Sequence, residues 1–170
     1  MSRLLLVDLS GLFWTAWHAT SDQELGSAFE LVYQRITRHM ADHDLVAVCV
    51  DSPPYKRKQI DPEYKANRDE PDLAAVDQLA RLRERLTADG HVVWGVQGYE
   101  ADDVIASACA IAAERELPVT ILSQDKDLAQ LVSDTTDIVV LNPRSGNRLD
   151  AAAVVDKFGV SPNQVRDFSP

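Results

Sequence analysis

Short apolar runs alternate along the chain with longer segments in which apolar residues recur every three or four positions. Continuous apolar runs of this length are typical of strands buried on both faces of a sheet, whereas the three-to-four spacing is typical of helices. The expected strands are 4–7, 45–50, 91–96, 119–122 and 138–141. The expected helices are 12–19, 24–40, 72–88, a helix opening at Glu100, 125–131, 150–158 and one that begins at Ser161-Pro162.

This alternation of strands and helices determines the expected fold class. Strands separated by helices form a mostly parallel sheet that is covered on both sides. We therefore expect an α/β fold, a three-layer sandwich with a central, mostly parallel, twisted sheet of about five strands and helices on both faces. The chain has 170 residues and no internal repeat, so we expect one domain over 1–170.

The ratio of basic to acidic residues argues against some classes of function. Lys and Arg number 17 against 27 Asp and Glu, which gives a net charge of -10, whereas a plain nucleic-acid binder is usually basic. Cys49 and Cys109 lie in apolar runs without zinc-ligand spacing, so we expect small buried hydrophobes. No apolar run approaches the roughly 20 residues of a membrane span and no signal peptide precedes the first strand. We expect a cytoplasmic protein without a membrane partner.

Acidic residues follow the expected strands. Ligands of open parallel sheets bind outside the carboxyl ends of the strands, and four strand ends here carry acids. Each acid alone has an ordinary alternative role as a helix cap or turn residue. Together they predict one acidic rim, made of Asp8, Asp51, Glu100, Asp102, Asp103, Asp125 and Asp127.

Such a rim needs a cation unless the acids fail to converge. Two like charges about 4 Å apart repel by about 1 kcal/mol in water and several times more near protein. Oxygen ligands suit hard divalent ions, so the expected cofactor is Mg²⁺ or Mn²⁺ and not zinc. Ions of this kind activate water and stabilise the leaving oxygen of a phosphodiester.

A basic segment follows Asp51 directly. Between Tyr55 and Arg68 the chain has five basic residues, Lys56, Arg57, Lys58, Lys65 and Arg68, and two acidic ones. Basic side chains beside a metal rim suit phosphate capture, and Tyr55 and Tyr64 are suited to stacking on bases. The alternative is a solvated surface loop.

Six motifs now point to a known family. The chain resembles the 5′-nuclease domain of bacterial DNA polymerase I and the related phage 5′-exonucleases and flap endonucleases, over essentially its whole length and in order. The resemblance implies a PIN-like fold. The motifs are LLLVDLSG with Asp8, VCVDSP with Asp51, EYKANRDE, GYEADDVIA at 98–106, ILSQDKDLAQLVSD at 121–134 and KFGVSPNQVRDF at 157–168.

The resemblance implies a metal-dependent 5′-nuclease of replication or repair. Its substrate would be DNA with a 5′ end, flap or nick, or an RNA–DNA primer, and its products a 5′-phosphate and a 3′-hydroxyl. The seven acids would be metal ligands, and 52–70 would be an arch or clamp that engages the substrate. The implied catalytic residues are Lys65, Arg68 and Asp102. The implied nucleic-acid contacts are Tyr55, Lys56, Arg57, Lys58, Tyr64, Lys65 and Arg68.

The chain departs from the family in one respect. The family continues after the equivalent of Arg166-Asp167-Phe168 into a GD-x-x-DN motif and a helix–hairpin–helix that holds duplex DNA through K⁺, and these 170 residues contain neither. The resemblance therefore implies one metal site and leaves the second, which involves Asp127, open. A longer chain or a partner chain would supply the remainder.

Two other functions remain open. One is a nucleic-acid-binding or regulatory remnant that binds a metal and does not cleave. The other is a small toxin-type ribonuclease, against which the long basic segment argues. A haloacid-type phosphatase is excluded, because Asp8-Leu9-Ser10 lacks the second Asp of its nucleophile pair.

Overall fold

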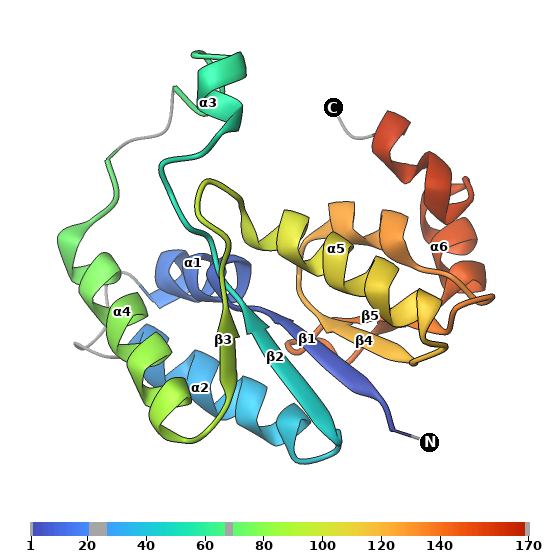
Figure 1. Ribbon diagram of the computed structural model, residues 1–170, viewed down its shortest axis with the longest axis horizontal. Helices are drawn as coiled ribbons and strands as arrows, with labels where there is room; N and C mark the ends of the chain where they lie inside the picture. The colour runs from blue at the N-terminus through green and yellow to red at the C-terminus, as the bar shows by residue number, and fades with distance from the viewer. Residues whose placement is uncertain (1, 21–26, 67–69, 169–170) are drawn as a thin grey trace.

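The computed structural model describes residues 2–20, 27–66 and 70–168, except the side chains of 166–168. A central sheet lies between two layers of helices (Figure 1). Its strands follow the order β3-β2-β1-β4-β5-β6. They are β1 (Leu4–Asp8), β2 (Leu45–Cys49), β3 (Val92–Trp94), β4 (Val119–Leu122), β5 (Ile138–Leu141) and β6 (Arg148–Leu149).

The sheet confirms the predicted α/β class and parallel topology. All pairings from β3 through β5 are parallel, and only β6 is antiparallel, against β5. The predicted strand over 91–96 is shorter, Val92–Trp94. The sixth strand has two residues, too few to produce a periodic pattern, and so it was not among the expected strands.

The helices lie close to their predicted positions, with two differences; residues 24–26, where the second helix was predicted to begin, lie outside the described residues. The first helix begins directly after Asp8 and not at residue 12, and the basic segment contains a short helix, α3. Among the described residues, no helix has the length and apolar character needed to cross a bilayer. The helices are α1 (Leu9–Thr20), α2 (Ser27–Met40), α3 (Arg57–Ile60), α4 (Leu73–Ala88), α5 (Ala101–Glu114), α6 (Ala151–Phe158) and the 3₁₀ helices η1 (Lys126–Leu131) and η2 (Pro162–Phe168).

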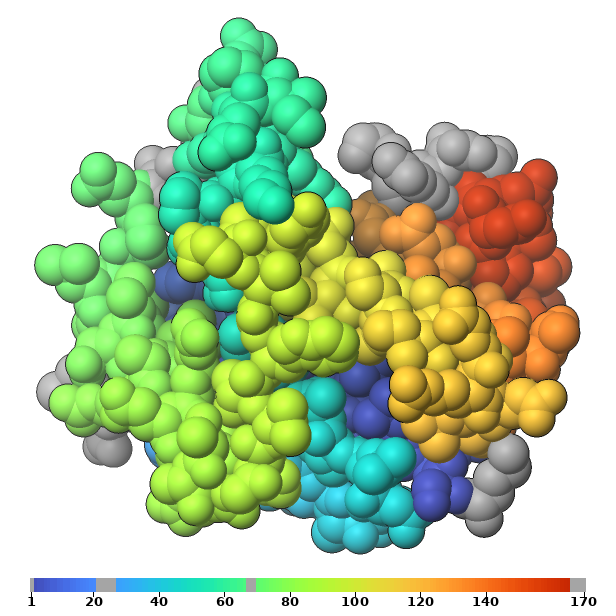
Figure 2. Space-filling model, in the orientation of Figure 1, coloured from blue at the N-terminus to red at the C-terminus, as the bar shows by residue number. Residues whose placement is uncertain are grey.

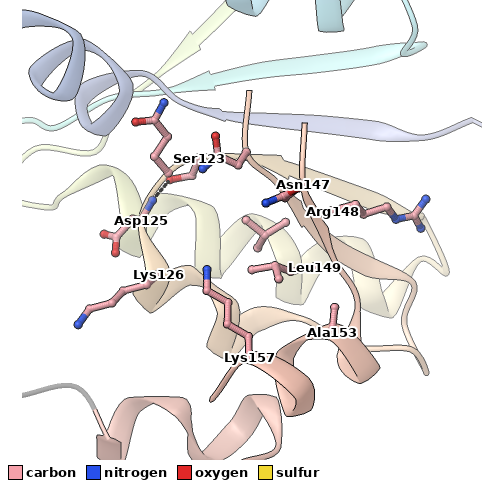
Figure 3. Close-up of a pocket in the computed structure, with 11 residues that line it drawn as sticks. Ser123, Asp125, Lys126, Asn147, Arg148, Leu149, Ala153 and Lys157 are labelled. Carbon is pink, nitrogen blue, oxygen red and sulfur yellow. Dashed lines mark hydrogen bonds between the residues drawn. The ribbon is translucent and has the colours of Figure 1, made fainter. Parts of the chain in front are cut away.

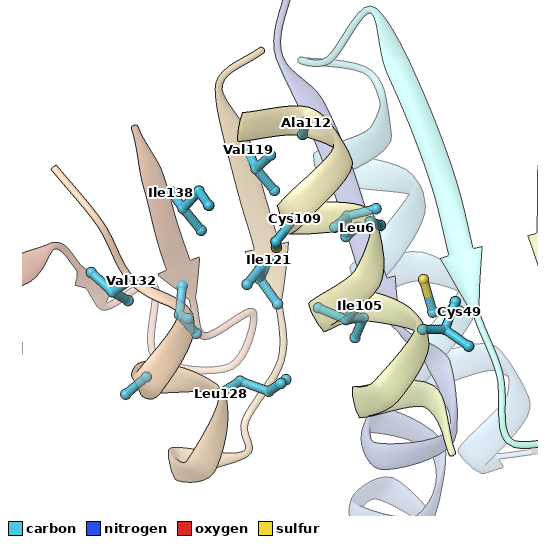
Figure 4. Packing of buried hydrophobic residues seen from close by; sticks show 14 of the residues in the cluster. Leu6, Cys49, Ile105, Cys109, Ala112, Val119, Ile121, Leu128, Val132 and Ile138 are labelled. Atoms are coloured by element: carbon cyan, nitrogen blue, oxygen red, sulfur yellow. The ribbon is translucent and has the colours of Figure 1, made fainter. Parts of the chain in front are cut away.

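Two apolar cores hold the layers together. On one face of the sheet α1, α2 and α4 pack against side chains such as Leu5 and Val7. On the other face α5, η1 and α6 pack against Leu6 and Ile121, as Figure 4 shows for α5. Burial of each such side chain contributes about 1.5–3 kcal/mol. Successive residues of β1 therefore serve both cores, which is why the run 4–7 is apolar throughout.

Both cysteines lie in the core, as predicted. Cys49 and Cys109 are free and buried, and burial raises the pKa of each thiol to about 12. Each thiol therefore stays protonated and packs as a small apolar side chain.

Strand register brings the acidic positions to one edge. Val7 pairs with Leu122 and Asp8 pairs with Cys49. Because the strands are parallel, Ser123 and Asp51 follow at the same carboxyl edge as Asp8. The acidic rim predicted from the sequence thus has a structural basis in this register.

Candidate metal centre and nucleic-acid interface

Asp8 is, with Glu100, one of the two most enclosed acids of the rim. It is only 6% exposed, and it accepts hydrogen bonds from Ser123 Oγ (2.7 Å) and from the Gly11 N–H (3.0 Å). The pKa of Asp8 is raised to about 6, chiefly by burial; its hydrogen bonds from Ser123 and Gly11 act against this rise, and the charges of Asp125 and Asp51 add to it. A bound cation would offset this cost of ionising Asp8.

Gly11 makes room for this carboxylate. A Cβ atom at Gly11 would overlap the Asp8 carboxyl group. Because Gly11 has no side chain, α1 can begin immediately beside Asp8. The Gly11 N–H then donates a hydrogen bond to Asp8 Oδ1.

Asp51 connects the end of β2 to the start of α5. Its Oδ1 accepts a 2.7 Å hydrogen bond from the Ala101 N–H, and its Oδ2 accepts one of 3.2 Å from the Tyr55 hydroxyl. Its own N–H donates to Ser10 Oγ over 3.0 Å. Both carboxylate oxygens are therefore held at the edge where β1 and β2 end.

The N-cap and first turn of α5 supply a compact group of three acids. Oxygens of Glu100, Asp102 and Asp103 all lie within 4.8 Å of one another, the spacing that ligands of one metal ion have. The pKa of Asp102 is raised, chiefly by burial and then by Asp103, and Asp51 contributes in the same direction. A helix N-terminus favours negative charge, which helps the fold to hold these acids together.

Asp125 and Asp127 follow β4. The Asp125 N–H donates to Ser123 Oγ over 3.0 Å, and the Asp127 N–H donates to Asp125 Oδ1 over 2.9 Å. Asp125 thus caps η1 and lies close enough to Asp8 to raise its pKa. Of the seven predicted ligands, only Glu100, Asp102 and Asp103 form the compact group; Asp8, Asp51, Asp125 and Asp127 lie outside it, although they are fixed to the same edge.

The basic segment folds over the acids of α5. Lys65 Nζ pairs with Glu100 Oε1, and Arg57 pairs with Glu100 Oε2 (3.1 Å) and with Asp103 Oδ1 (2.5 Å). The Tyr64 hydroxyl donates to Glu100 Oε2 over 2.6 Å. Figure 2 shows this segment projecting above the loop that leads into α5. The predicted proximity of basic segment and acidic rim is therefore present.

Aromatic rings surround the cations of this segment. Lys65 Nζ lies 5.2 Å from the ring centroids of both Tyr55 and Tyr64, and Lys56 Nζ lies 4.7 Å from that of Tyr99. Lys65 has a φ of 56°, a left-handed conformation that costs energy for a residue with a side chain. Lys58 is exposed, and Arg68 lies outside the described residues. The individual roles of these residues stay predictions.

Known proteins resemble this chain in sequence and in fold. The model of the 5′-3′ exonuclease N-terminal resolvase-like domain matches residues 3–159. The chain belongs to this family. DNA polymerase I of Pseudomonas aeruginosa is 36% identical over 174 residues, which cover 97% of this chain and 19% of that protein. The chain thus spans about a fifth of the polymerase, and the predicted resemblance is confirmed.

Two solved structures share the fold of this exonuclease-family domain. The D15 protein of bacteriophage T5, co-crystallised with metal ions, matches with a TM-score of 0.74 and 20% identity over 96% of this chain and 64% of that chain. A pseudo-enzyme-product complex of the T5 D15 flap endonuclease with DNA and metal ions has a TM-score of 0.69 and 19% identity, covering 95% and 63%. At these identities the matches establish the fold alone.

Sequence reasoning missed the polar residues that orient the acids. Ser123, which is 1% exposed, and Ser10, which is 4% exposed, bind Asp8 and the Asp51 N–H respectively. The available signal was position, because each serine lies within two residues of a strand-end acid. In the exonuclease-family domain these hydroxyls connect strands that are far apart in the sequence.

Proposed function

We propose that this domain is a metal-dependent 5′-nuclease that hydrolyses phosphodiester bonds near the 5′ ends or 5′ flaps of DNA. One observation carries the proposal: acids from three parallel strand ends and from the first turn of α5 share an edge with a basic, tyrosine-bearing segment that pairs with them. Family membership supports it. The related T5 flap endonuclease forms a complex with DNA and metal ions.

The donor set fits a hard divalent cation. Every candidate ligand is a carboxylate oxygen, and burial raises the pKa of both Asp8 and Asp102, so an added positive charge would stabilise their ionised forms. Oxygen-only donors favour Mg²⁺ or Mn²⁺. When bound, such ions supply activation of water and neutralisation of phosphate charge. We assign Asp8, Asp51, Glu100, Asp102, Asp103 and Asp125 to this centre, and Asp127 to a second site.

The cations of the basic segment then serve the substrate. Lys65 and Arg57 now neutralise Glu100 and Asp103; in the complex Lys65 donates to a non-bridging oxygen of the scissile phosphate. We expect Arg68 to act beside it, and Tyr55 and Tyr64 to stack on the terminal bases. The water oxygen forms a bond to phosphorus as the bond to the 3′ oxygen breaks, which leaves a 5′-phosphate and a 3′-hydroxyl.

The substrate range follows from the family and belongs to the same proposal. It comprises 5′ ends, nicks and flaps, together with RNA primers on DNA, in replication or repair. Substrates whose duplex part must be bound by a helix–hairpin–helix would need a further segment or a partner chain that provides this motif.

Cleavage of a labelled 5′-flap DNA tests the proposal. The purified chain should cleave with Mn²⁺ or Mg²⁺ and not with EDTA, and the new end should carry a 5′-phosphate. Asp102→Ala should abolish cleavage while circular dichroism stays unchanged. The matched control is Glu114→Gln, an exposed acid at the far end of the same helix, which should cleave like the unaltered chain.

Two outcomes would reject the nuclease assignment. Equal cleavage by Asp102→Ala would show that the activity does not arise at this centre. Tight DNA binding without cleavage under any divalent ion would favour the non-cleaving binding remnant.

A further inference from the structure

A concavity lies beside Asp125, on the side of the sheet that carries β5 and β6. It has a volume of about 320 Å³, which is within the roughly 300–1,000 Å³ typical of ligand sites. The loop after β4, the hairpin between β5 and β6, and α6 form its walls (Figure 3). Its polar lining comprises Ser123, Gln124, Asp125, Lys126, Asn142, Asn147, Arg148 and Lys157.

Basic residues outnumber acidic ones in the lining of this pocket. Three of its lining residues are basic and one is acidic, in a chain whose net charge is -10. Among the residues that the structure describes, Lys126, Arg148 and Lys157 form no ion pair with a carboxylate. This contrasts with Arg57 and Lys65, whose charges are already matched by acids of α5. The pocket therefore has positive charge available for an anionic ligand.

The donors are arranged around an apolar floor. The Lys157 side chain extends from α6 into the pocket, whereas Lys126 and Arg148 extend away from its centre (Figure 3). Asn142 Oδ1 accepts hydrogen bonds from the N–H groups of Arg144 (2.9 Å) and Ser145 (3.2 Å), so its side-chain NH₂ is the part left to bind a ligand. An ammonium and an amide NH₂ are both donors that suit phosphate oxygens.

We propose that this pocket binds a phosphate group of the nucleic-acid substrate, next to the phosphate that is cleaved. This inference rests on the proposed function, because Asp125 is shared by the pocket wall and the candidate metal centre. Lys157 donates to the phosphate from α6 and Asn142 donates from the β5–β6 hairpin. A single carboxylate does not suit a metal ion, whereas the Lys157 ammonium, which extends into the pocket, attracts an anion. The pocket thus fixes the substrate strand on the β5 side, opposite the basic segment.

Binding measurements with Lys157→Met test the site. The variant keeps the aliphatic stem and removes one charge; Arg83→Met, an exposed arginine on α4, is the matched control. The affinity of each protein for a 5′-flap DNA is measured by fluorescence anisotropy in EDTA at several salt concentrations. For Lys157→Met the slope of log K against log salt should be smaller in magnitude than for the unaltered chain by about 0.7–0.9, which is the effect of one lost phosphate contact. With Mn²⁺, KM should rise about threefold with kcat unchanged. A Lys157→Met variant that behaves like Arg83→Met, or one that loses kcat alone, would overturn the proposal.

Neutral linkages identify the phosphate and its source. In a series of 5′-flap DNAs, each with one neutral methylphosphonate linkage at a different position, one DNA should bind the unaltered chain more weakly. The same DNA should bind Lys157→Met no more weakly than unmodified DNA does. A 5′-hydroxyl in place of a 5′-phosphate tests instead for a terminal monoester. If one of these changes weakens DNA binding by the unaltered chain but not by Lys157→Met, the pocket binds a phosphate, and the change that has this effect identifies which phosphate it is. Equal sensitivity of both proteins to every change rejects it.

The two proposals fail in different ways. If the unaltered chain neither binds nor cleaves DNA, the proposed function itself is wrong. If it binds and cleaves while Lys157→Met matches Arg83→Met, only the phosphate pocket is wrong.

Discussion

Ser123 Oγ donates a 2.7 Å hydrogen bond to Asp8 Oδ2 and accepts one of 3.0 Å from the Asp125 N–H. A single buried hydroxyl thereby connects the acids that follow two neighbouring strands, β1 and β4. These two contacts make Ser123 the positioning residue for the Asp8 carboxylate and for the backbone of Asp125.

Removing this hydroxyl should damage the metal centre more than the fold. For Ser123→Ala we expect unfolding to become easier by about 1–3 kcal/mol, because a buried carboxylate loses a partner, and we expect divalent-ion affinity to fall about tenfold, the cost of a disturbed outer-shell contact. Urea denaturation and calorimetric titration with Mn²⁺ measure the two effects. Ser123→Thr should restore the affinity, and Ser145→Ala, at an exposed turn, should change neither quantity. Normal Mn²⁺ binding by Ser123→Ala would contradict the role.

Gly11→Ala should conflict with the Asp8 carboxylate. The added Cβ overlaps that group, and overpacking of this kind costs about 1–3 kcal/mol. A double-mutant cycle with Asp8→Ala checks the cause, because removing the carboxylate should relieve most of the cost. If Gly11→Ala is equally destabilising in both backgrounds, the effect arises from α1 itself.

The metal-free protein should become less stable as pH rises from about 4 to about 6. The pKa of Asp8 is raised from 3.8 to about 6 by burial, so the folded state binds its proton more tightly than the unfolded state does. Stability is therefore lost as Asp8 ionises between these values, by about 3 kcal/mol at 1.36 kcal/mol per pKa unit. Urea denaturation in EDTA at several pH values measures this loss. Asp8→Asn should flatten the profile, and an unchanged slope in that variant would assign the effect to other groups.

Divalent ions should reverse that loss at neutral pH. At an ion concentration of about 100 times Kd, binding adds about 2.7 kcal/mol, which corresponds to a rise in melting temperature of roughly 5–10 °C for a domain of this size. Scanning calorimetry with Mn²⁺ and with EDTA measures the shift. Asp102→Ala should abolish it and Glu114→Gln should retain it. No shift in the unaltered chain at millimolar Mn²⁺ would show that the acids do not form a cation site.

The same ions should loosen the basic segment. Lys65 and Arg57 pair with Glu100, which is also a candidate ligand, so cation and segment compete for its oxygens. Partly exposed ion pairs contribute roughly 1 kcal/mol together, and their loss should speed tryptic cleavage between residues 56 and 65 about fivefold. Limited proteolysis followed by mass spectrometry measures the rate. Glu100→Gln should show the faster rate without metal, whereas slower cleavage on adding Mn²⁺ would contradict the competition.

Much of this protein could be predicted because local patterns and parallel topology point to the same arrangement. Buried strands such as Leu4–Asp8 are apolar on both faces, and helices such as α4 repeat apolar residues at helical spacing, so element types and order are visible in the sequence. Acids at parallel strand ends must meet at one edge, which is why Asp8, Asp51 and Asp125 could be grouped in advance. The strand β6 was not predicted, because its two residues form a strand only through their pairing with β5.

What the sequence determined by itself was the fold class, the family and the candidate acids, since these depend on patterns within short segments. Only the tertiary structure decided which partners orient those acids, that Lys65 pairs with Glu100, and that Lys157 shares a pocket with Asp125. The decisive contacts are long-range: Ser123 lies 115 positions from Asp8 in the sequence, Lys65 lies 35 from Glu100 and Asp125 lies 32 from Lys157. They depend on side-chain geometry after packing, and no local pattern in the chain records that geometry.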